Sequence, residues 1–295
     1  MPLQGINNMM RHALQGSYAV GYFESWSLES LQGVVDAAEK TRSPVIVGFN
    51  GDFLSRPERI VKERLSMYGA LGKAAADSVS VPCGLIFNEC PRDSWVKQAC
   101  ECGFNLVMPV PTGNDDDGYE ARIANIVRFA HERGVAVEAE LGSLPCGVSG
   151  MAEEGSKTDP QAAEDFVRKT GIDLLAISVG NVHIMTEGEV GLDFNLLEKI
   201  HKRVDVPLVL HGGSGIDANA LARAISMGVA KVNYGTYLKQ HYLKAISRAL
   251  DSELPNPHVM LGMGGPEDVL AAGRTAVRDA VMERIELLGC CGKAE

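Results

Sequence analysis

Short apolar runs alternate with helix-patterned segments along most of this chain. Residues 18–23 read YAVGYF, and residues 28–40 follow with apolar side chains at helical spacing. Eight such runs occur, at residues 18–23, 44–49, 82–87, 104–108, 135–139, 174–178, 206–210 and 230–233. Strands that alternate with helices form a parallel sheet, and eight of them can close into a barrel. We therefore expect an α/β fold, a (β/α)8 TIM barrel; an open doubly wound sheet is disfavoured because no GxGxxG motif follows the first run.

The segments between these runs are expected to be helices. Their bounds are residues 28–40, 57–76, 93–102, 119–133, 161–170, 195–203 and 218–227. No linker, repeat or low-complexity stretch interrupts the chain. Residues 1–295 are therefore expected to form a single TIM-barrel domain, with a C-terminal helical extension from about residue 256 for packing or subunit contact.

Composition and charge limit the partners that this chain can have. The net charge of -10 argues against nucleic acid and anionic membrane as partners, because neither would be attracted. The seven cysteines are irregularly spaced, and no apolar run is long enough for a signal peptide or a membrane span. We expect a cytoplasmic homo-oligomer, a dimer or tetramer, with reduced thiols and a small molecule as its ligand.

The most informative segment is residues 206–215, VPLVLHGGSG. A buried strand here ends at His211, and the glycine-rich turn with Gly212 and Ser214 leads into a helix. Imidazole is a common metal ligand, and glycine N–H groups at a helix N-terminus bind phosphate. A second loop, residues 233–236 (NYGT), follows the eighth run, and the loops after strands seven and eight commonly hold phosphate in TIM barrels. Plain tight turns are the alternative interpretation of both loops.

Other polar residues stand at the ends of neighbouring strands. His183 follows the sixth strand and His211 the seventh, and adjacent parallel strands lie about 4.8 Å apart. Both imidazoles could therefore reach one ion, with Glu140 or Glu89 adding a carboxylate oxygen. Glu138 and Glu140 share one face of their strand because side chains alternate along it. The alternative interpretations are core histidines and a solvated strand edge.

Together these motifs resemble those of the class II, metal-dependent ketose-bisphosphate aldolases, which include the fructose- and tagatose-bisphosphate enzymes. The resemblance covers about residues 18–245 and is strongest at 137–142 (VEAELG), around His183, at 209–215 (VLHGGSG) and at 231–236 (KVNYGT). It implies that His183 and His211 bind the catalytic metal, and that Glu140 serves an alternative or second metal position. It also implies a phosphorylated sugar as substrate, with phosphate held by Gly212, Ser214, Gly235 and Thr236, and with Asn233 contacting the substrate.

Several positions depart from the family pattern, including Ile184, which follows His183 where glycine is usual. After the third strand the family usually has H-x-D-H, whereas residues 86–89 read IFNE. Asn88 thus replaces the acid/base aspartate and Glu89 replaces a metal-binding histidine, while Glu24 stands where asparagine is common. Glu89 with two histidines is a ligand set that suits Mn²⁺, Fe²⁺ or Co²⁺ as well as the Zn²⁺ that we expect. Because an amide cannot shuttle a proton, Glu24 or Glu187 is a candidate for that role.

We therefore expect a class II aldolase-like lyase. It would use a divalent metal to cleave or form a C–C bond in a phosphorylated ketose, or a related sugar-acid phosphate, through an enediolate. Two other hypotheses remain open. Asn88 and Glu24 would also suit a metal-dependent isomerase or lyase with changed chemistry on the same barrel. A non-catalytic partner subunit of an aldolase is the third hypothesis, although it would have no need of His183 and His211.

Overall fold

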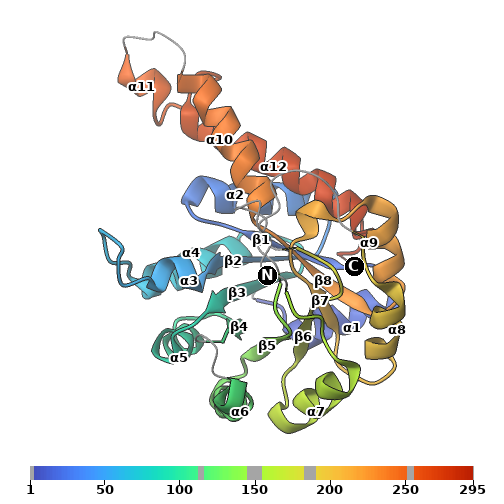
Figure 1. Ribbon diagram of the computed structural model, residues 1–295. Coiled ribbons are helices and arrows are strands. Elements are labelled where there is room, and N and C mark those ends of the chain that lie inside the picture. Colours follow the sequence, from blue (N-terminus) through green and yellow to red (C-terminus); the bar gives the residue numbers. More distant parts are fainter. Residues whose placement is uncertain (1–2, 112–115, 145–154, 183–190, 251–255, 295) are drawn as a thin grey trace.

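Eight parallel strands close into a barrel in the computed structural model, which describes residues 3–111, 116–144, 155–182, 191–250 and 256–294. The strands pair in chain order and β8 pairs with β1, as Figure 1 shows. This confirms the expected α/β class and TIM barrel. The strands are β1 (Val20–Glu24), β2 (Val45–Asn50), β3 (Cys83–Cys90), β4 (Leu106–Pro109), β5 (Ala136–Leu141), β6 (Leu174–Ile177), β7 (Leu208–Leu210) and β8 (Val229–Tyr234).

Helices surround this barrel and bury its outer face (Figure 1). Many begin at a side chain that accepts backbone N–H groups, such as Ser27 before α2 and Asp217 before α9. The helices are α1 (Ile6–Gln15), α2 (Leu28–Thr41), α3 (Gly51–Ser55), α4 (Leu65–Asp77), α5 (Asp93–Glu101), α6 (Asp116–His131), α7 (Pro160–Thr170), α8 (Phe194–His201), α9 (Ala218–Ile225), α10 (Thr236–Leu250), α11 (Pro257–Met260) and α12 (Val269–Leu287). Residues 213–215 form a short 3₁₀ turn.

The helix expected over residues 57–76 was wrong at its start. The structure has the short helix α3 directly after β2, and α4 begins only at Leu65. The reason is packing, because Ile60 and Val61 are exposed and offer no apolar face to the barrel. In contrast, Leu65, Gly69, Gly72 and Ala76 recur at helical spacing and are buried.

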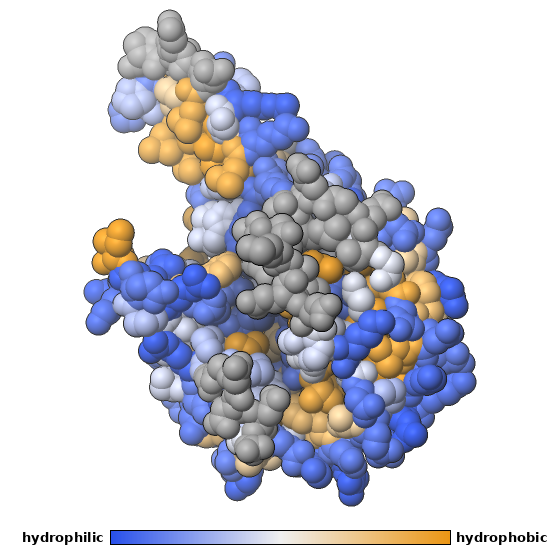
Figure 2. Space-filling view, viewed as in Figure 1, coloured by the Kyte–Doolittle hydropathy of each residue, from blue (hydrophilic) through white to orange (hydrophobic). Residues whose placement is uncertain are grey.

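The last helices form an arm that extends beyond the barrel. Helices α10 and α12 lie side by side, with α11 at the tip (Figure 1). Helix α12 packs on α2, and Arg274 of α12 donates to both carboxylate oxygens of Asp36 at 2.6 and 2.7 Å. Figure 2 shows apolar side chains exposed on this arm. No helix among the described residues is long and apolar enough to cross a membrane.

Candidate active site

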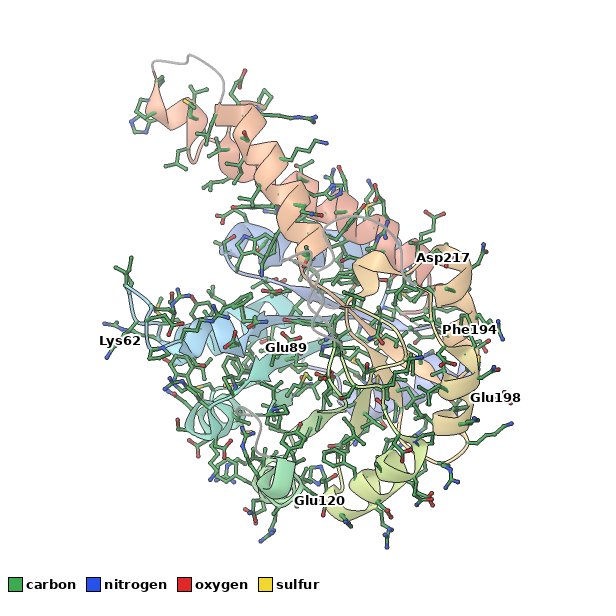
Figure 3. The ribbon with its side chains drawn as sticks, in the orientation of Figure 1. Lys62, Glu89, Glu120, Phe194, Glu198 and Asp217 are labelled. Atoms are coloured by element: carbon green, nitrogen blue, oxygen red, sulfur yellow. The ribbon has the colours of Figure 1, made fainter. Side chains whose placement is uncertain are left out.

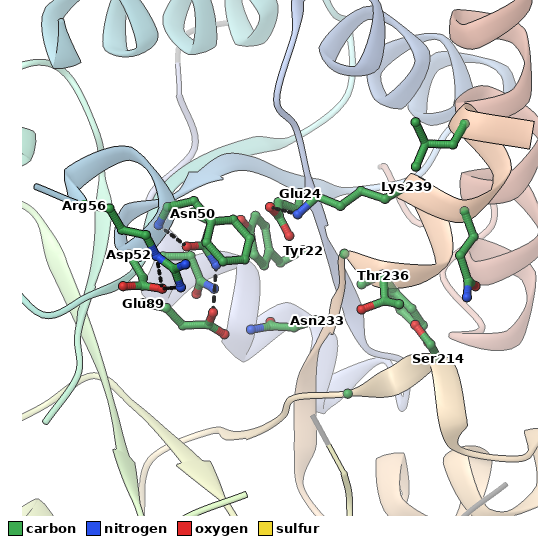
Figure 4. A pocket seen from close by; sticks show the side chains of 17 residues that line it. Tyr22, Glu24, Asn50, Asp52, Arg56, Glu89, Ser214, Asn233, Thr236 and Lys239 are labelled. Carbon is green, nitrogen blue, oxygen red and sulfur yellow. Dashed lines mark hydrogen bonds and ion pairs between the residues drawn. The ribbon is translucent and has the colours of Figure 1, made fainter. Parts of the chain in front are cut away.

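A cavity of about 470 Å³ opens at the carboxyl ends of the strands (Figure 4). Chemistry in this fold takes place at that face of the barrel. The lining residues are Tyr22, Glu24, Asn50, Asp52, Phe53, Arg56, Asn88, Glu89, Gly212, Ser214, Asn233, Tyr234, Gly235, Thr236, Lys239, Gln240 and Leu243. The structure thus brings together eight of the residues that the sequence singled out: Glu24, Asn88, Glu89, Gly212, Ser214, Asn233, Gly235 and Thr236.

Glu89 reaches this cavity from an irregular part of β3. The register between β3 and β4 shifts between Phe87 and Cys90, and Glu89 has a left-handed backbone with φ of 55°. For a residue with a Cβ, this conformation costs about 1–2 kcal/mol. Bulges of this kind often re-aim a side chain beside an active site. Figure 3 shows Glu89 inside the ring of helices, whereas Glu120 and Glu198 lie on the outside.

Two neighbours hold the Glu89 carboxylate in place. Asn50 Nδ2 donates to Glu89 Oε2 at 2.8 Å, and Asn50 Oδ1 in turn accepts the N–H of Phe53 at the start of α3. On the other side, Glu89 Oε1 lies 3.0 Å from His211 Nδ1. The end of β2 and the start of α3 therefore position Glu89 against His211.

His211 is buried between two carboxylates. Its second ring nitrogen, Nε2, lies 2.9 Å from Glu138 Oε1, and Glu138 Oε2 lies 2.8 Å from Lys231 Nζ. Burial lowers the pKa of His211, but the hydrogen bonds to Glu138 and Glu89 outweigh this and raise that pKa to about 10. Burial opposes the charge of Glu138 as well, yet Lys231 and His211 hold the pKa of this carboxyl below its usual range.

The partner of His211 on β5 is Glu138. Glu140 faces the same side of β5 as Glu138 but is half-buried and does not line the cavity. His183 and Glu187 lie outside the described residues. The sequence contained a signal for Glu138, since it shares a strand face with Glu140. Lys231 was not predicted from the sequence, although a lysine inside an apolar strand indicates a buried partner.

His211 and Glu89 provide two donor atoms that suit one metal ion. Zinc ligands lie about 2.0–2.2 Å from the ion, so neighbouring ligand atoms are about 3 Å apart. The 3.0 Å between His211 Nδ1 and Glu89 Oε1 matches this separation. Glu138 binds the other ring nitrogen, as carboxylates commonly do for metal-bound histidines. No group of three His, Cys, Asp or Glu side chains that could hold an ion occurs within the described ranges, so a third ligand would come from elsewhere.

The opposite side of the cavity is built from glycine-rich turns. Gly212 has φ of 69°, which favours glycine, and it leads into the turn that carries Ser214. Gly235 precedes α10, where a Cβ would lie 2.3 Å from Glu24 Oε2. Backbone N–H groups of such turns, together with a helix N-terminus, form an anion site. Lys239, one turn into α10, forms an ion pair with Glu24 at the same wall (Figure 4).

Four residues that line this cavity have a buried polar atom with no hydrogen-bond partner among the described residues. These atoms are Asn88 Oδ1, Asn233 Nδ2 and the hydroxyls of Tyr22 and Tyr234. Lys231 Nζ donates to the other end of the Asn233 amide at 2.6 Å. An unsatisfied buried polar group costs about 1–3 kcal/mol, so such groups indicate a ligand that completes them. A molecule with hydroxyl or carbonyl groups and an anionic end matches this cavity.

Comparison with known proteins agrees with this geometry. The family model described as fructose-bisphosphate aldolase class-II matches residues 4–293. A fructose-bisphosphate aldolase of Geobacillus stearothermophilus is 33% identical over 298 residues, which is 100% of this chain and 99% of the relative. The crystal structure of the YdjI aldolase from Escherichia coli K12 is similar, with a TM-score of 0.81 and 31% identity over 99% of this chain and 100% of that one. A structure described as a putative fructose-1,6-biphosphate aldolase from Coccidioides immitis has a TM-score of 0.82 and 26% identity, and covers 98% of both chains.

Proposed function

The chain belongs to the class II fructose-bisphosphate aldolase family, and we propose that it is a divalent-metal-dependent lyase of phosphorylated ketoses or related sugar-acid phosphates. Members of this family generally depend on a divalent metal ion. One observation carries the proposal: the donor pair His211 and Glu89 and the glycine-rich turns belong to one barrel mouth. An ion site and a phosphate site so close together would hold the ketone and the phosphate of one small substrate.

The metal would be bound by His211 Nδ1 and Glu89 Oε1, with His183 as the third ligand. Glu140 would serve an alternative or second position. Zn²⁺ is the ion that we propose, and Mn²⁺, Fe²⁺ and Co²⁺ also suit this mixture of imidazole and carboxylate. When bound, the ion would polarise the ketone carbonyl of the substrate.

The chain's own residues would orient the substrate and move its protons. Gly212, Ser214, Gly235 and Thr236 would bind the phosphate with their N–H and hydroxyl groups, because these residues line the cavity beside the start of α10. Asn233 Nδ2 would donate to a substrate oxygen, and Asn88 Oδ1 would accept from a substrate hydroxyl. Both buried amide atoms would then have a hydrogen-bond partner. Fixing the reacting carbons in this way lowers the entropic part of the barrier.

Glu24 is the carboxylate that we propose as the proton acceptor. It is 8% exposed and lies beside Gly235, next to the proposed phosphate site. It would take the proton from the carbon next to the ketone, and the electron pair of that C–H bond would remain on the carbon and its carbonyl group. Asn88 has no proton to exchange in this way.

A cleavage assay tests the function. The purified protein would be incubated with ketose 1-phosphates, ketose bisphosphates and sugar-acid phosphates, and the release of a triose phosphate would be measured. We expect release from at least one substrate, a loss of at least about 100-fold in His211→Ala, and unchanged turnover in His258→Ala, an exposed histidine of α11.

Other outcomes would separate the remaining possibilities. An isomerase would return a product with all carbon atoms of the substrate, and a non-catalytic subunit would return none. Equal turnover by His211→Ala and the wild type would overturn the proposal. We also propose that the protein is cytoplasmic and a homo-oligomer.

A further inference from the structure

Joining two carbonyl compounds requires two proton transfers. One proton is removed from the donor carbon, and another is delivered to the aldehyde oxygen. When the donor carbon attacks an aldehyde, the C–C bond forms and the electrons of the C=O π bond move onto the aldehyde oxygen. That oxygen must receive a proton to become the product hydroxyl. General acids that supply such a proton typically contribute about 10²–10⁴ in rate. The donor of this proton must be a side chain that lines the cavity.

The ionisable side chains of the lining are mostly engaged with one another. Asp52 forms an ion pair with Arg56, and Glu24 forms one with Lys239 (Figure 4). Glu89 is held by Asn50 and His211. A carboxylate in such a pair accepts protons and has none to donate.

Tyr22 differs from these residues. Its side chain is 2% exposed and lines the cavity, and its hydroxyl has no hydrogen-bond partner among the described residues. Buried tyrosine hydroxyls usually find a partner. Lys231 Nζ lies over the Tyr22 ring, 5.2 Å from its centre, at a cation–π distance.

The neighbours of Tyr22 place it among the substrate-binding groups. It stands two residues before Glu24 on β1, so both side chains face the same side of the strand. Its register partner on β8 is Asn233, whose Nδ2 also lacks a partner in the described part of the chain. Of the four uncompleted groups, only the phenols of Tyr22 and Tyr234 can transfer a proton. Tyr234 directly follows Asn233 on β8, so its side chain faces the other side of the strand, where it stacks on Phe23. Tyr22 is therefore the phenol on the same side as Asn233 and Glu24.

We propose that Tyr22 is a further catalytic residue, the general acid that protonates the aldehyde oxygen when the C–C bond forms. The phenol O–H bond breaks, its proton goes to the new alkoxide oxygen, and the phenolate regains a proton from solvent. Cleavage follows the same path in reverse. Burial, and then the charges of Glu24, Glu89 and Glu138, raise the pKa of Tyr22 well above its ordinary value. The phenol is therefore protonated at neutral pH, as a proton donor must be.

This inference rests on the proposed function, and its test separates the two proton transfers. With the enzyme in ²H₂O, dihydroxyacetone phosphate exchanges the proton of its reacting carbon for deuterium without forming a new C–C bond. NMR follows this exchange. Condensation with D-glyceraldehyde 3-phosphate, or with the aldehyde released in the cleavage assay, reports the second transfer. We expect Tyr22→Phe to lose about 10²–10⁴ in the rate of condensation and to keep exchange within about threefold of the wild type.

Three further variants complete the experiment. Tyr18→Phe removes the hydroxyl of another buried tyrosine, which binds His12 outside the cavity, and should leave both rates unchanged. Glu24→Gln should slow exchange and condensation together. In the Tyr22→Phe background, Asn88→Asp restores an acid to the cavity and should recover at least about tenfold in condensation.

The outcomes are distinguishable. Condensation by Tyr22→Phe at the wild-type rate overturns the role of Tyr22, as does a parallel loss of exchange and condensation, which would indicate a structural role. Failure of Asn88→Asp to recover any condensation would also count against it. If the wild type shows neither exchange nor cleavage, the proposed function itself fails.

Discussion

At the scale of single residues, the centre of the barrel is a buried row of alternating charges. Glu89, His211, Glu138 and Lys231 come from four different strands or strand ends, and each contacts the next within 3.0 Å. Removing one member of a buried ion pair leaves an uncompensated charge, which costs about 3–5 kcal/mol. The row therefore couples the stability of the barrel to the geometry of its active site.

This row predicts a large effect of Glu138→Gln. The variant leaves Lys231, which is fully buried, without its carboxylate partner. We expect the free energy of unfolding, measured in urea, to fall by about 3–5 kcal/mol. Glu120→Gln removes a carboxylate that pairs with Lys169 on the surface and should change it by less than about 1 kcal/mol. A loss below about 1 kcal/mol in Glu138→Gln would contradict the proposed importance of the row.

The sequence predicted the site residues that belong to a recognisable motif. It predicted less well those that are brought to the site only by the folding of the barrel. His211, Gly212 and Gly235 stand out by type and spacing. Glu138 and Lys231 lie deeper in the barrel, and their contact depends on how β5 and β8 face each other across its interior. Tyr22 resembled an ordinary strand residue, because nothing in its neighbours along the chain shows that its hydroxyl would lack a partner.

At the scale of elements, the turns at the barrel mouth depend on the absence of a side chain. Gly235→Ala would place a methyl group against the Glu24 carboxylate, 2.3 Å from Oε2, and would disturb the pair with Lys239. We expect binding of inorganic phosphate, measured by calorimetry, to weaken at least about tenfold because the turn must open. Gly265→Ala is the control, since a Cβ there meets only Glu267 at an ordinary 3.6 Å. Equal affinities in both variants would place the phosphate elsewhere.

The start of α12 depends on one carboxylate. Asp268 accepts backbone N–H groups from Gly262, Gly264, Leu270 and Ala271, and those bonds, led by the one from Gly264, lower its pKa. A carboxyl whose pKa is lower in the folded than in the unfolded state stabilises the fold at any pH above its unfolded pKa of about 3.9. This stabilisation is lost as the pH falls through the pKa of the folded state.

We therefore expect Asp268→Ala to lower the Tm by a few degrees at pH 7, because the cap is lost. The difference from the wild type should shrink as the pH falls below about 4, because the carboxyl is protonated there in the unfolded chain and, at still lower pH, in the folded protein. Thermal unfolding followed by circular dichroism measures both. Asp279→Ala, on the same helix but exposed, should show no such pH-dependent difference. A difference that stays constant down to pH 3 would contradict this role.

Element boundaries show why the local sequence was not sufficient. The eight strands were predicted in order because each is a short apolar run between helices. The bulge at Glu89 was not, since it depends on a contact across strands, that of Asn50 with Glu89. The short helix α3 was missed although its signal is local, because Asn50 caps it by accepting the N–H of Phe53. The segment 57–64 has helix-compatible residues, yet nothing in the barrel buries its apolar side chains.

At the scale of the whole molecule, the arm of α10, α11 and α12 is the feature that a closed barrel does not need. Exposed apolar side chains on it include Leu243, Leu250, Leu261 and Met263, each more than half exposed. Apolar surface of this kind (Figure 2) commonly marks a protein–protein interface. We expect it to contact a second copy of the chain, in agreement with the homo-oligomer that we propose.

This predicts that charges on the arm change the molar mass in solution. Leu250→Glu combined with Leu261→Glu should convert a dimer or tetramer into a monomer, because burying two unpaired carboxylates is costly. Light scattering coupled to gel filtration measures this. Ile60→Glu changes an exposed apolar residue far from the arm and should leave the mass unchanged. A monomeric wild type would show that the arm has another role.

We propose that this barrel holds a divalent ion at His211 and Glu89. The most direct measurement is the metal content of the zinc-loaded, desalted protein by plasma mass spectrometry, compared between the wild type, His211→Ala and Glu89→Ala. We predict about one ion per chain in the wild type and less than about a tenth of that in each variant, since each loses one of about three protein ligands. A wild type that retains no ion, or variants that retain as much as the wild type, would contradict the claim.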